Sequence, residues 1–361
     1  MPKKYEFLVD NLLDWYDENR RILPWREDPK PYYVWVSEIM LQQTRVEAVK
    51  GYFTRFMEAL PTIQHLAKVP EDRLMKLWEG LGYYNRVRNL QKAAQMVVNE
   101  YHGQLPQDYE ELLKLPGIGS YTAGAIASIA YNKKVPAVDG NVLRITKRVE
   151  ASYDDITKAR VVKEVEQDLL LIMPNRAGDF NQSLMDLGAT ICLPNGKPLC
   201  HQCPVQSYCK AFEKKIVMEL PVKPGKKPRK LENKTVLVLE YQNRYAIRKR
   251  PSNGLLAKLW ELPNINQQLS PDELEEYLLN AGVSNFEIEL LGKAKHVFSH
   301  VEWHMLGYKI KLNEIISVKP SLEEETLLKE DMIWVTNQEL QSDYALPNAF
   351  DAYKTWQEEG H

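Results

Sequence analysis

The chain has 361 residues, of which 44% are hydrophobic and 27% are charged, so it is long enough for two domains and has the composition of a globular protein. No apolar run is long enough to cross a bilayer and the N-terminal segment has no apolar signal core, so we expect a cytoplasmic protein without membrane contact. The net charge of −2 averages two unlike parts: residues 1–230 carry 34 Lys/Arg and 28 Asp/Glu, whereas residues 231–361 carry 13 and 21. The net charge of +6 (34 − 28) on the first part is compatible with phosphate binding, and ordinary solvated charge explains it equally well.

Residues 1–212 are predicted to form a mostly α-helical domain. Stretches such as DRLMKLWEGLGYY, RVRNLQKAAQMVVNEY and ARVVKEVEQDLLLIM repeat apolar residues at helical spacing, and short breaks with Pro or Gly separate them. Strand-like alternation is nearly absent from this part.

The stretch WVSEIMLQQT (35–44) places a carboxyl group inside an apolar helix. Glu38 is surrounded by Trp35, Ile39 and Met40, and a carboxyl in such a setting is costly unless it is paired or its pKa rises. A raised pKa suits a group that delivers a proton near neutral pH. Periodicity equally allows Glu38 to be a half-exposed helix residue.

Two Gly-containing turns follow. LPGIGSYTAGA predicts a helix end, a tight turn with Gly117 and Gly119, and a second helix, so that backbone N–H groups could converge on a phosphate. VPAVDGNVLRI places Asp139 at the start of another helix, where an N-cap is its simplest interpretation. A single Gly-x-Gly is weak evidence for nucleic-acid binding.

All four cysteines lie within 18 residues, in a C-x7-C-x2-C-x5-C arrangement formed by Cys192, Cys200, Cys203 and Cys209. A disulfide framework is improbable in a large chain without a secretory signal, so the group predicts a four-thiolate metal site. Zinc and a [4Fe–4S] cluster both accept four cysteines, and spacing alone does not choose between them.

The segment PVKPGKKPRK (221–230) has three prolines, one glycine, five basic residues and no acidic ones, and we expect it to lie in a linker over residues 213–232. Residues 233–361 then change period. TVLVLEY and YAIRKR, separated by Gln242, Asn243 and Arg244, predict a β-hairpin, and later strands around a helix at SPDELEEYLLNAG predict an α+β domain.

Taken together and in this order, WVSEIMLQQT, WEGLGYYNRVRNL, LPGIGSYTAGA, VDGNV and the cysteine run resemble the adenine DNA glycosylases of the MutY family, in the helix–hairpin–helix superfamily that includes endonuclease III. The resemblance covers nearly the whole chain. It implies a helix–hairpin–helix glycosylase domain (1–212) with a [4Fe–4S] loop (192–209), followed by a Nudix-like domain (233–361). The implied activity is the hydrolysis of adenine from duplex DNA opposite 8-oxoguanine or guanine, by a monomer in the bacterial cytoplasm or nucleoid.

The resemblance also implies roles for individual residues. Glu38 matches the acid that protonates the flipped adenine at N7 and then assists water attack, and Asp139 matches the carboxylate that stabilises the sugar cation. Such a division of labour between two carboxyl groups is that of glycoside hydrolysis. Tyr121 and Asn141 match groups that assist this pair.

Three further groups of residues are implied by the same resemblance. The first forms the adenine pocket, the second contacts DNA beside the lesion or at the hairpin, and the third contacts 8-oxoguanine: Trp25, Arg26 and Gln182; Gln43, Tyr83, Gly117 and Gly119; and Phe298, Ser299 and His300. The four cysteines match ligands of a [4Fe–4S] cluster, which favours that cofactor over zinc. From sequence alone a plain β-turn with Phe298 buried is the preferred interpretation of the Phe298–His300 stretch.

Three features depart from the family pattern. Seven residues separate Cys192 from Cys200, where six are usual. Tyr121 stands where endonuclease III carries lysine, which favours simple hydrolysis over Schiff-base strand cleavage. Leu279 and Asn280 stand where a Nudix box has glutamates, so a pyrophosphatase site is improbable. The alternatives are a bifunctional pyrimidine glycosylase/lyase like endonuclease III, and a non-catalytic iron–sulfur DNA-binding protein.

Overall fold

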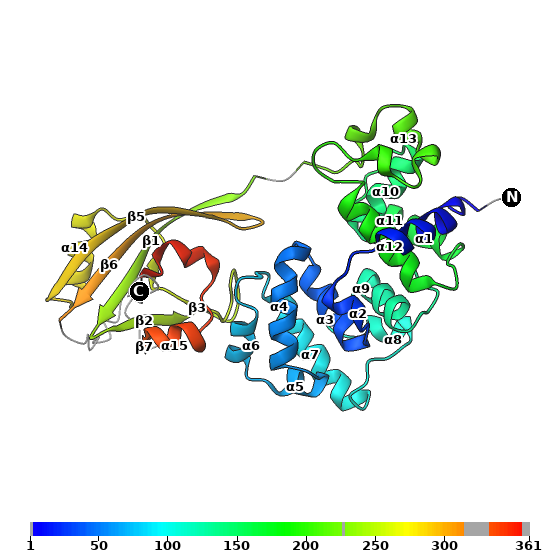
Figure 1. Cartoon of the computed structure of the whole chain (residues 1–361). Coiled ribbons are helices and arrows are strands. Elements are labelled where there is room, and N and C mark those ends of the chain that lie inside the picture. Colours follow the sequence, from blue (N-terminus) through cyan, green and yellow to red (C-terminus); the bar gives the residue numbers. More distant parts are fainter. Residues whose placement is uncertain (1–2, 226–227, 314–331, 356–361) are drawn as a thin grey trace. The chain divides into compact units, whose positions relative to one another are not determined.

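The structure, a computed structural model, describes residues 3–225, 228–313 and 332–355 (Figure 1). It contains two compact units: residues 1–69 with 85–225, and residues 70–84 with 226–361. Each is considered by itself. Among the described residues, no helix combines the length and apolar character that a membrane crossing requires.

The first unit is helical, as the sequence predicts. Its longer elements are α1 (Phe7–Asn19), α2 (Pro24–Glu27), α3 (Pro31–Leu41), α4 (Val46–Ala59), α5 (Ile63–Lys68), α7 (Asn85–Glu100), α8 (Tyr109–Leu113), α9 (Ser120–Ala125), α10 (Gly140–Glu150), α11 (Ala159–Leu170), α12 (Ala177–Thr190) and α13 (Lys210–Glu213). A π-helical turn η1 (Ile126–Ala130) extends α9, and short 3-10 turns are η2 (Cys200–Gln202), η3 (Gln206–Tyr208) and η4 (Val217–Glu219).

Helix α10 runs through the core of this unit. Every residue from Val142 to Val149 is buried, including the side chains of Arg144, Lys147 and Arg148. Buried charges need partners, and each of these three side chains has them. Polar contacts thus fix the helix along its length.

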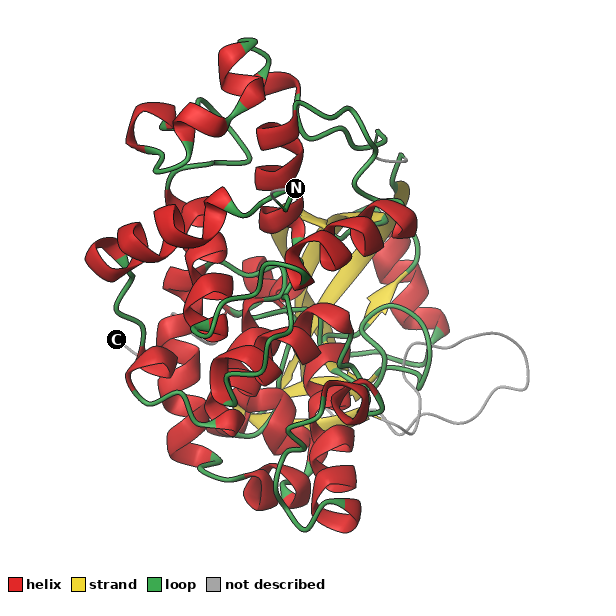
Figure 2. Cartoon of the chain, turned by 90° about the vertical axis from the view of Figure 1, so that its right-hand side faces the viewer, coloured by secondary structure: helices red, strands yellow, loops and turns green. Residues whose placement is uncertain are grey.

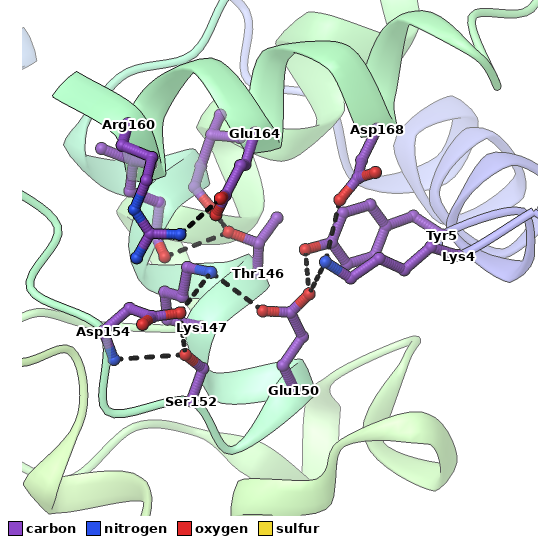
Figure 3. A network of polar contacts seen from close by, with 12 residues as sticks. Lys4, Tyr5, Thr146, Lys147, Glu150, Ser152, Asp154, Arg160, Glu164 and Asp168 are labelled. Atoms are coloured by element: carbon purple, nitrogen blue, oxygen red, sulfur yellow. Dashed lines mark hydrogen bonds and ion pairs between the residues drawn. The ribbon is translucent and has the colours of Figure 1, made fainter. Parts of the chain in front are cut away.

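A polar network holds the C-terminal end of α10 (Figure 3). Glu150 accepts a hydrogen bond from the Tyr5 hydroxyl at 2.5 Å and pairs with Lys4 at 2.5 Å and with Lys147 at 3.0 Å. The pKa of Glu150 is lowered, because these hydrogen bonds outweigh the opposing effect of burial. The chain's first residues are thereby tied to the helix that begins at Asp139.

In the second unit one sheet dominates, and Figure 2 draws its strands in yellow. The strands are β1 (Lys230–Tyr241), β2 (Arg244–Lys249), β3 (Trp260–Glu261), β4 (Asn264–Ile265), β5 (Phe286–Val297), β6 (Val301–Leu312) and β7 (Met332–Thr336). The order is β3-β2-β1-β6-β5, with β4 against β1 and β7 against β2. Strands β1 and β6 pair in parallel, and the other pairs are antiparallel.

Strand alternation sends side chains into two separate cores. Val236 and Val238 of β1 belong to one cluster with Trp303, whereas Leu237 and Leu239 belong to the other. Helix α15 (Asn337–Ser342) and the 3-10 turn η5 (Asn348–Tyr353) contribute to the first cluster, and α14 (Pro271–Asn280) contributes to the second. The predicted α+β domain is confirmed. Leu279 and Asn280, which replace the Nudix glutamates, end α14.

The unit boundaries differ from the expected 1–212, 213–232 and 233–361. Helix α13 and the turn η4 already occupy part of the expected linker, and β1 begins at Lys230 because its first residues pair with Val301 and its neighbours on β6. Residues 70–84, with α6 (Glu71–Leu77), group with the C-terminal part. Lys76 donates to the carbonyls of Leu340 and Tyr344, at 2.9 and 3.1 Å.

Candidate active site

A cavity of about 660 Å³ in the helical unit collects the residues for which the sequence predicts catalysis and adenine binding. They come from five helices or helix starts that lie far apart in the chain. These lining residues are Trp25 and Arg26 of α2, Glu38 of α3, Tyr121 of α9, Asp139 and Asn141 at the start of α10, and Gln182 of α12.

Glu38 is a buried acid in this wall. Its side chain lies on α3, where all residues from Val34 to Met40 are buried, and the residue is only 5% exposed. The Tyr121 hydroxyl donates to Glu38 Oε2 at 2.6 Å. Burial raises the pKa of Glu38 to about 7, and the Tyr121 hydrogen bond counteracts part of that rise. The carboxyl is therefore both protonated and deprotonated in substantial fractions near neutral pH.

Asp139 occupies a different environment in the same cavity. It is the N-cap of α10: Oδ1 accepts from the backbone N–H groups of Asn141 and Val142 at 2.8 and 2.9 Å, and Oδ2 accepts from Asn141 Nδ2 at 2.6 Å. Burial raises the pKa of Asp139, whereas these three N–H donors favour its charged form. The N-cap interpretation is thus correct, and it leaves the carboxylate facing the cavity.

Asn141 is fixed from behind by Arg144, a residue that the sequence did not single out. Arg144 Nη2 donates to Asn141 Oδ1 at 2.9 Å and to the Gly188 carbonyl at 2.7 Å, and Arg144 Nε donates to the Cys192 carbonyl at 2.7 Å. A Cβ at position 188 would lie 2.6 Å from the Asn141 Cβ, so glycine is needed there. The sequence signal was an arginine one turn after Asn141, which is too common to interpret alone.

A second residue that the sequence analysis missed is Asp186, which holds the lining residue Arg26. Its side chain has no exposed surface and pairs with two arginines: Arg26 at 2.8 and 2.9 Å, and Arg21 at 2.8 and 2.5 Å. The pKa of Asp186 is lowered, because these guanidinium groups outweigh burial. Asp186 lies one helical turn after Gln182 on α12, and this spacing was the available signal.

The predicted DNA-contact residues are dispersed over exposed turns. Gln43 follows α3 with φ of 59°, and Gly117, with φ of 78°, precedes Gly119, the N-cap of α9. A Cβ at position 117 would lie 2.7 Å from the Asn89 Cβ, which explains that glycine. Tyr83, in the second unit, is 49% exposed.

The four cysteines line one cavity after α12. Arg148 Nη1 donates to Cys192 Sγ at 3.2 Å, and burial raises the pKa of Cys203 to about 12. The additional residue before Cys200 lies in an exposed turn, which a hydrogen bond from Leu199 N to Ile191 O (3.0 Å) closes. The insertion therefore leaves the four thiols together. Among residues 3–225, 228–313 and 332–355, no three His, Cys, Asp or Glu side chains are arranged to hold a single metal ion.

Phe298, Ser299 and His300 form the turn between β5 and β6. Phe298 N donates to Val301 O at 2.8 Å, and the half-buried Phe298 ring packs against Trp303, with centroids 4.9 Å apart. Ser299 and His300 are exposed, and the Ser299 and Tyr83 hydroxyl oxygens are 3.2 Å apart. The β-turn interpretation is correct for the backbone, and two polar side chains remain accessible.

Comparison with known proteins identifies related DNA-repair proteins. Residues 36–169 match the HhH-GPD superfamily of base excision DNA repair proteins, and residues 235–355 match the NUDIX domain. The adenine DNA glycosylase of Rattus norvegicus is 38% identical over 84% of this chain and 70% of its own length. That of Buchnera aphidicola subsp. Schizaphis graminum is 35% identical over 84% of this chain and 87% of its own length.

Among solved structures, a thermostable thymine-DNA glycosylase is similar to 58% of this chain and 95% of its own chain, with a TM-score of 0.53 and 30% identity. That share matches the size of the helical unit. The curated relatives that match 84% of the chain are named adenine DNA glycosylases, and a match of that length reaches from the helical unit into the Nudix-like part. The chain therefore belongs to the adenine DNA glycosylase family, in the HhH-GPD superfamily of base excision DNA repair proteins.

Proposed function

We propose that this glycosylase hydrolyses the N-glycosidic bond of adenine opposite 8-oxoguanine or guanine in duplex DNA, without cleaving the strand. The observation that carries the proposal is the pair of carboxyl groups, Glu38 and Asp139, in one cavity with different surroundings. Duplex DNA buries its bases, so adenine must first leave the stack, and a cavity of about 660 Å³ has room for it.

Glu38 and Asp139 divide the chemistry. Protonated Glu38 gives its proton to adenine N7, so that the base leaves as a neutral molecule, and the resulting carboxylate accepts a proton from the attacking water. Tyr121 holds the Glu38 carboxyl by its 2.6 Å hydrogen bond. Asp139, oriented by Asn141, places negative charge beside the cation that develops on the sugar. Trp25, Arg26 and Gln182 surround the base.

An oligonucleotide assay tests this function. Duplexes with adenine opposite 8-oxoguanine, guanine or thymine are incubated with excess enzyme. Each sample is then divided in two, and one half is treated with hot alkali. We expect strand scission only after alkali, and only opposite 8-oxoguanine and guanine. Scission without alkali would support the endonuclease III-like lyase, and no scission at all would support a non-catalytic DNA-binding protein.

For the cysteine loop we propose a [4Fe–4S] cluster held by Cys192, Cys200, Cys203 and Cys209. The donor set fits, because four thiols line one cavity and Arg148 donates to one sulfur. When bound, the cluster would brace residues 192–209. Binding requires thiolates, so loading releases protons.

Metal analysis distinguishes the two cofactors. Anaerobically purified protein should be yellow-brown and contain about four irons per chain. A colourless, active preparation with one zinc per chain would contradict the cluster. The Cys200→Ser variant should lose iron and visible absorbance.

We further propose that Ser299 and His300 recognise 8-oxoguanine. Guanine N7 is an acceptor, whereas the oxidised base carries N7–H and an oxygen at C8. The Ser299 hydroxyl can accept a hydrogen bond from N7–H or donate one to the C8 oxygen, so it can bind the oxidised base. The exposed turn supports this assignment. A cytoplasmic, monomeric enzyme is the remaining proposal, tested by fractionation and by size-exclusion chromatography with light scattering.

A further inference from the structure

A second cavity lies behind the base-side wall of the active-site cavity. Its volume is about 640 Å³, and its rim consists of exposed residues, among them Arg20, Ile22 and Arg176, so it opens to solvent. The two cavities share the same five lining residues: Arg21, Leu23, Arg26, Ile129 and Gln182. One layer of side chains thus separates the adenine pocket from a second outlet.

Two polar members of the shared wall are held differently. Gln182 is 9% exposed; its amide lies at the surface of the cavities rather than among the fully buried groups, and it makes no hydrogen bond with a residue that the structure describes. At a cavity surface such an amide can donate to a ligand and accept from it. Arg26, in contrast, is held by Asp186 through two hydrogen bonds of 2.8 and 2.9 Å. Gln182 can therefore move aside without losing a hydrogen bond to a described residue, while Arg26 stays in place.

The second cavity suits a neutral, polar ligand. Arg21 and Arg26 are paired with Asp186, and Arg176 pairs with Asp17 at 2.5 Å and with Asp179 at 2.8 Å. With their charges matched, these arginines offer N–H donors without a strong net attraction for anions. A free purine base, which carries donors, acceptors and no charge, has the matching chemistry.

We propose that the second cavity is the exit for excised adenine, which passes the Gln182 wall while the DNA product still covers the first opening. This inference rests on the proposed function, because it places the sugar beside Asp139 and the base toward Arg26 and Gln182. Once the glycosidic bond is broken, the base has no tether and the cavity at its back is the nearest solvent path. Release of adenine is then independent of release of DNA.

The test follows both products of one turnover. A duplex with tritium-labelled adenine opposite 8-oxoguanine is fixed to beads, excess enzyme is added, and the rates of alkali-sensitive site formation, adenine release and enzyme release are measured. We expect adenine in the filtrate well before the enzyme leaves the beads. Adenine that stays until the enzyme leaves would overturn the exit. An absence of alkali-sensitive sites would instead contradict the proposed function.

Two matched variants show which opening is used. Ile22→Trp enlarges a rim residue that is 80% exposed and lines only the second of the two cavities, whereas Leu171→Trp enlarges a residue that is 62% exposed and lines neither. Ile22→Trp should slow adenine release severalfold with unchanged excision, and Leu171→Trp should change neither rate. Equal adenine release from the two variants would assign release to the DNA-facing opening and overturn the proposal.

Discussion

The active-site cavity and the Phe298–His300 turn are built on opposite principles. In the cavity, polar groups are buried and fixed: Glu38 is 5% exposed, and Asp139 accepts three hydrogen bonds from its own helix start. In the turn, a half-buried Phe298 anchors the backbone while Ser299 and His300 stay in solvent. Burial changes the acidity of the first set, and exposure leaves the second set free to meet a partner.

The buried groups of the cavity suit catalysis, whereas the exposed groups of the turn suit discrimination between bases. Proton transfer requires a carboxyl whose pKa matches the working pH, which only a low-polarity setting provides here. Discrimination between two bases requires donors and acceptors that are accessible before the partner arrives. Substitutions in the cavity should therefore change excision on every substrate, whereas substitutions in the turn should change the ratio between substrates.

The largest effect is expected from Glu38→Gln, which keeps the shape and removes the transferable proton. Single-turnover excision should fall roughly 10²–10⁴-fold opposite both 8-oxoguanine and guanine, while DNA binding persists. Glu27→Gln, at an exposed position of the neighbouring segment, is the control and should retain activity. A rate near wild type would remove Glu38 from the mechanism.

The next effect concerns the turn. Ser299→Ala combined with His300→Ala should slow excision opposite 8-oxoguanine by an amount equivalent to about 1–3 kcal/mol and spare adenine opposite guanine. Both substrates are measured at matched salt, because phosphate contacts depend on it. Equal slowing on both would assign the turn to folding or general DNA binding. These point variants are preferable to deletion after residue 225, which would also expose the side of α6 that Lys249 and Trp260 contact through Asp72.

A smaller effect is expected from Tyr121→Phe, which separates the influence of burial on the pKa of Glu38 from that of the Tyr121 hydrogen bond. The proposed mechanism requires protonated Glu38, so the excision rate should fall as pH rises through about 7. Tyr121→Phe removes a hydrogen bond that favours the carboxylate, so the pKa of Glu38 should rise and activity should persist to higher pH. A hydrogen bond worth about 1 kcal/mol corresponds to somewhat less than one pH unit. The pH–rate profile measures it, and a shift to lower pH would contradict the assigned contact.

The smallest effect on activity is expected from Glu150→Gln, at the far end of α10. Weakening its contacts with Lys4, Tyr5 and Lys147 should lower the free energy of unfolding by about 1–3 kcal/mol at neutral pH. The pKa of Glu150 is lowered in the folded state, so this stabilisation is present above the ordinary carboxyl pKa and is lost as pH falls below it. Chemical denaturation of both proteins at neutral pH and at a pH below the ordinary carboxyl pKa measures the difference in the free energy of unfolding. A changed ratio between the two DNA substrates would contradict a purely structural role.

Much of the architecture was determined by local patterns in the sequence. The helical period over residues 1–212 and the hairpin formed by TVLVLEY and YAIRKR depend on neighbours within a few residues, and the structure confirms both. The turn is one residue shorter than the predicted connection, because Arg244 already pairs with Tyr241. The gathered cysteines were equally visible, because their spacing is short. The N-cap at Asp139 was predicted for the same reason, since its partners are two and three residues away.

Only the tertiary structure decided what depends on long-range contacts. The burial of Glu38, its hydrogen bond to Tyr121 across 83 positions and the pairing of Arg26 with Asp186 across 160 positions arise when distant helices pack. The same holds for the grouping of residues 70–84 with the C-terminal part and for the cavity behind Gln182. Helical periodicity gives the face of a residue but not its partner, and the electrostatics of a buried group is set by the partners and by the water that packing excludes.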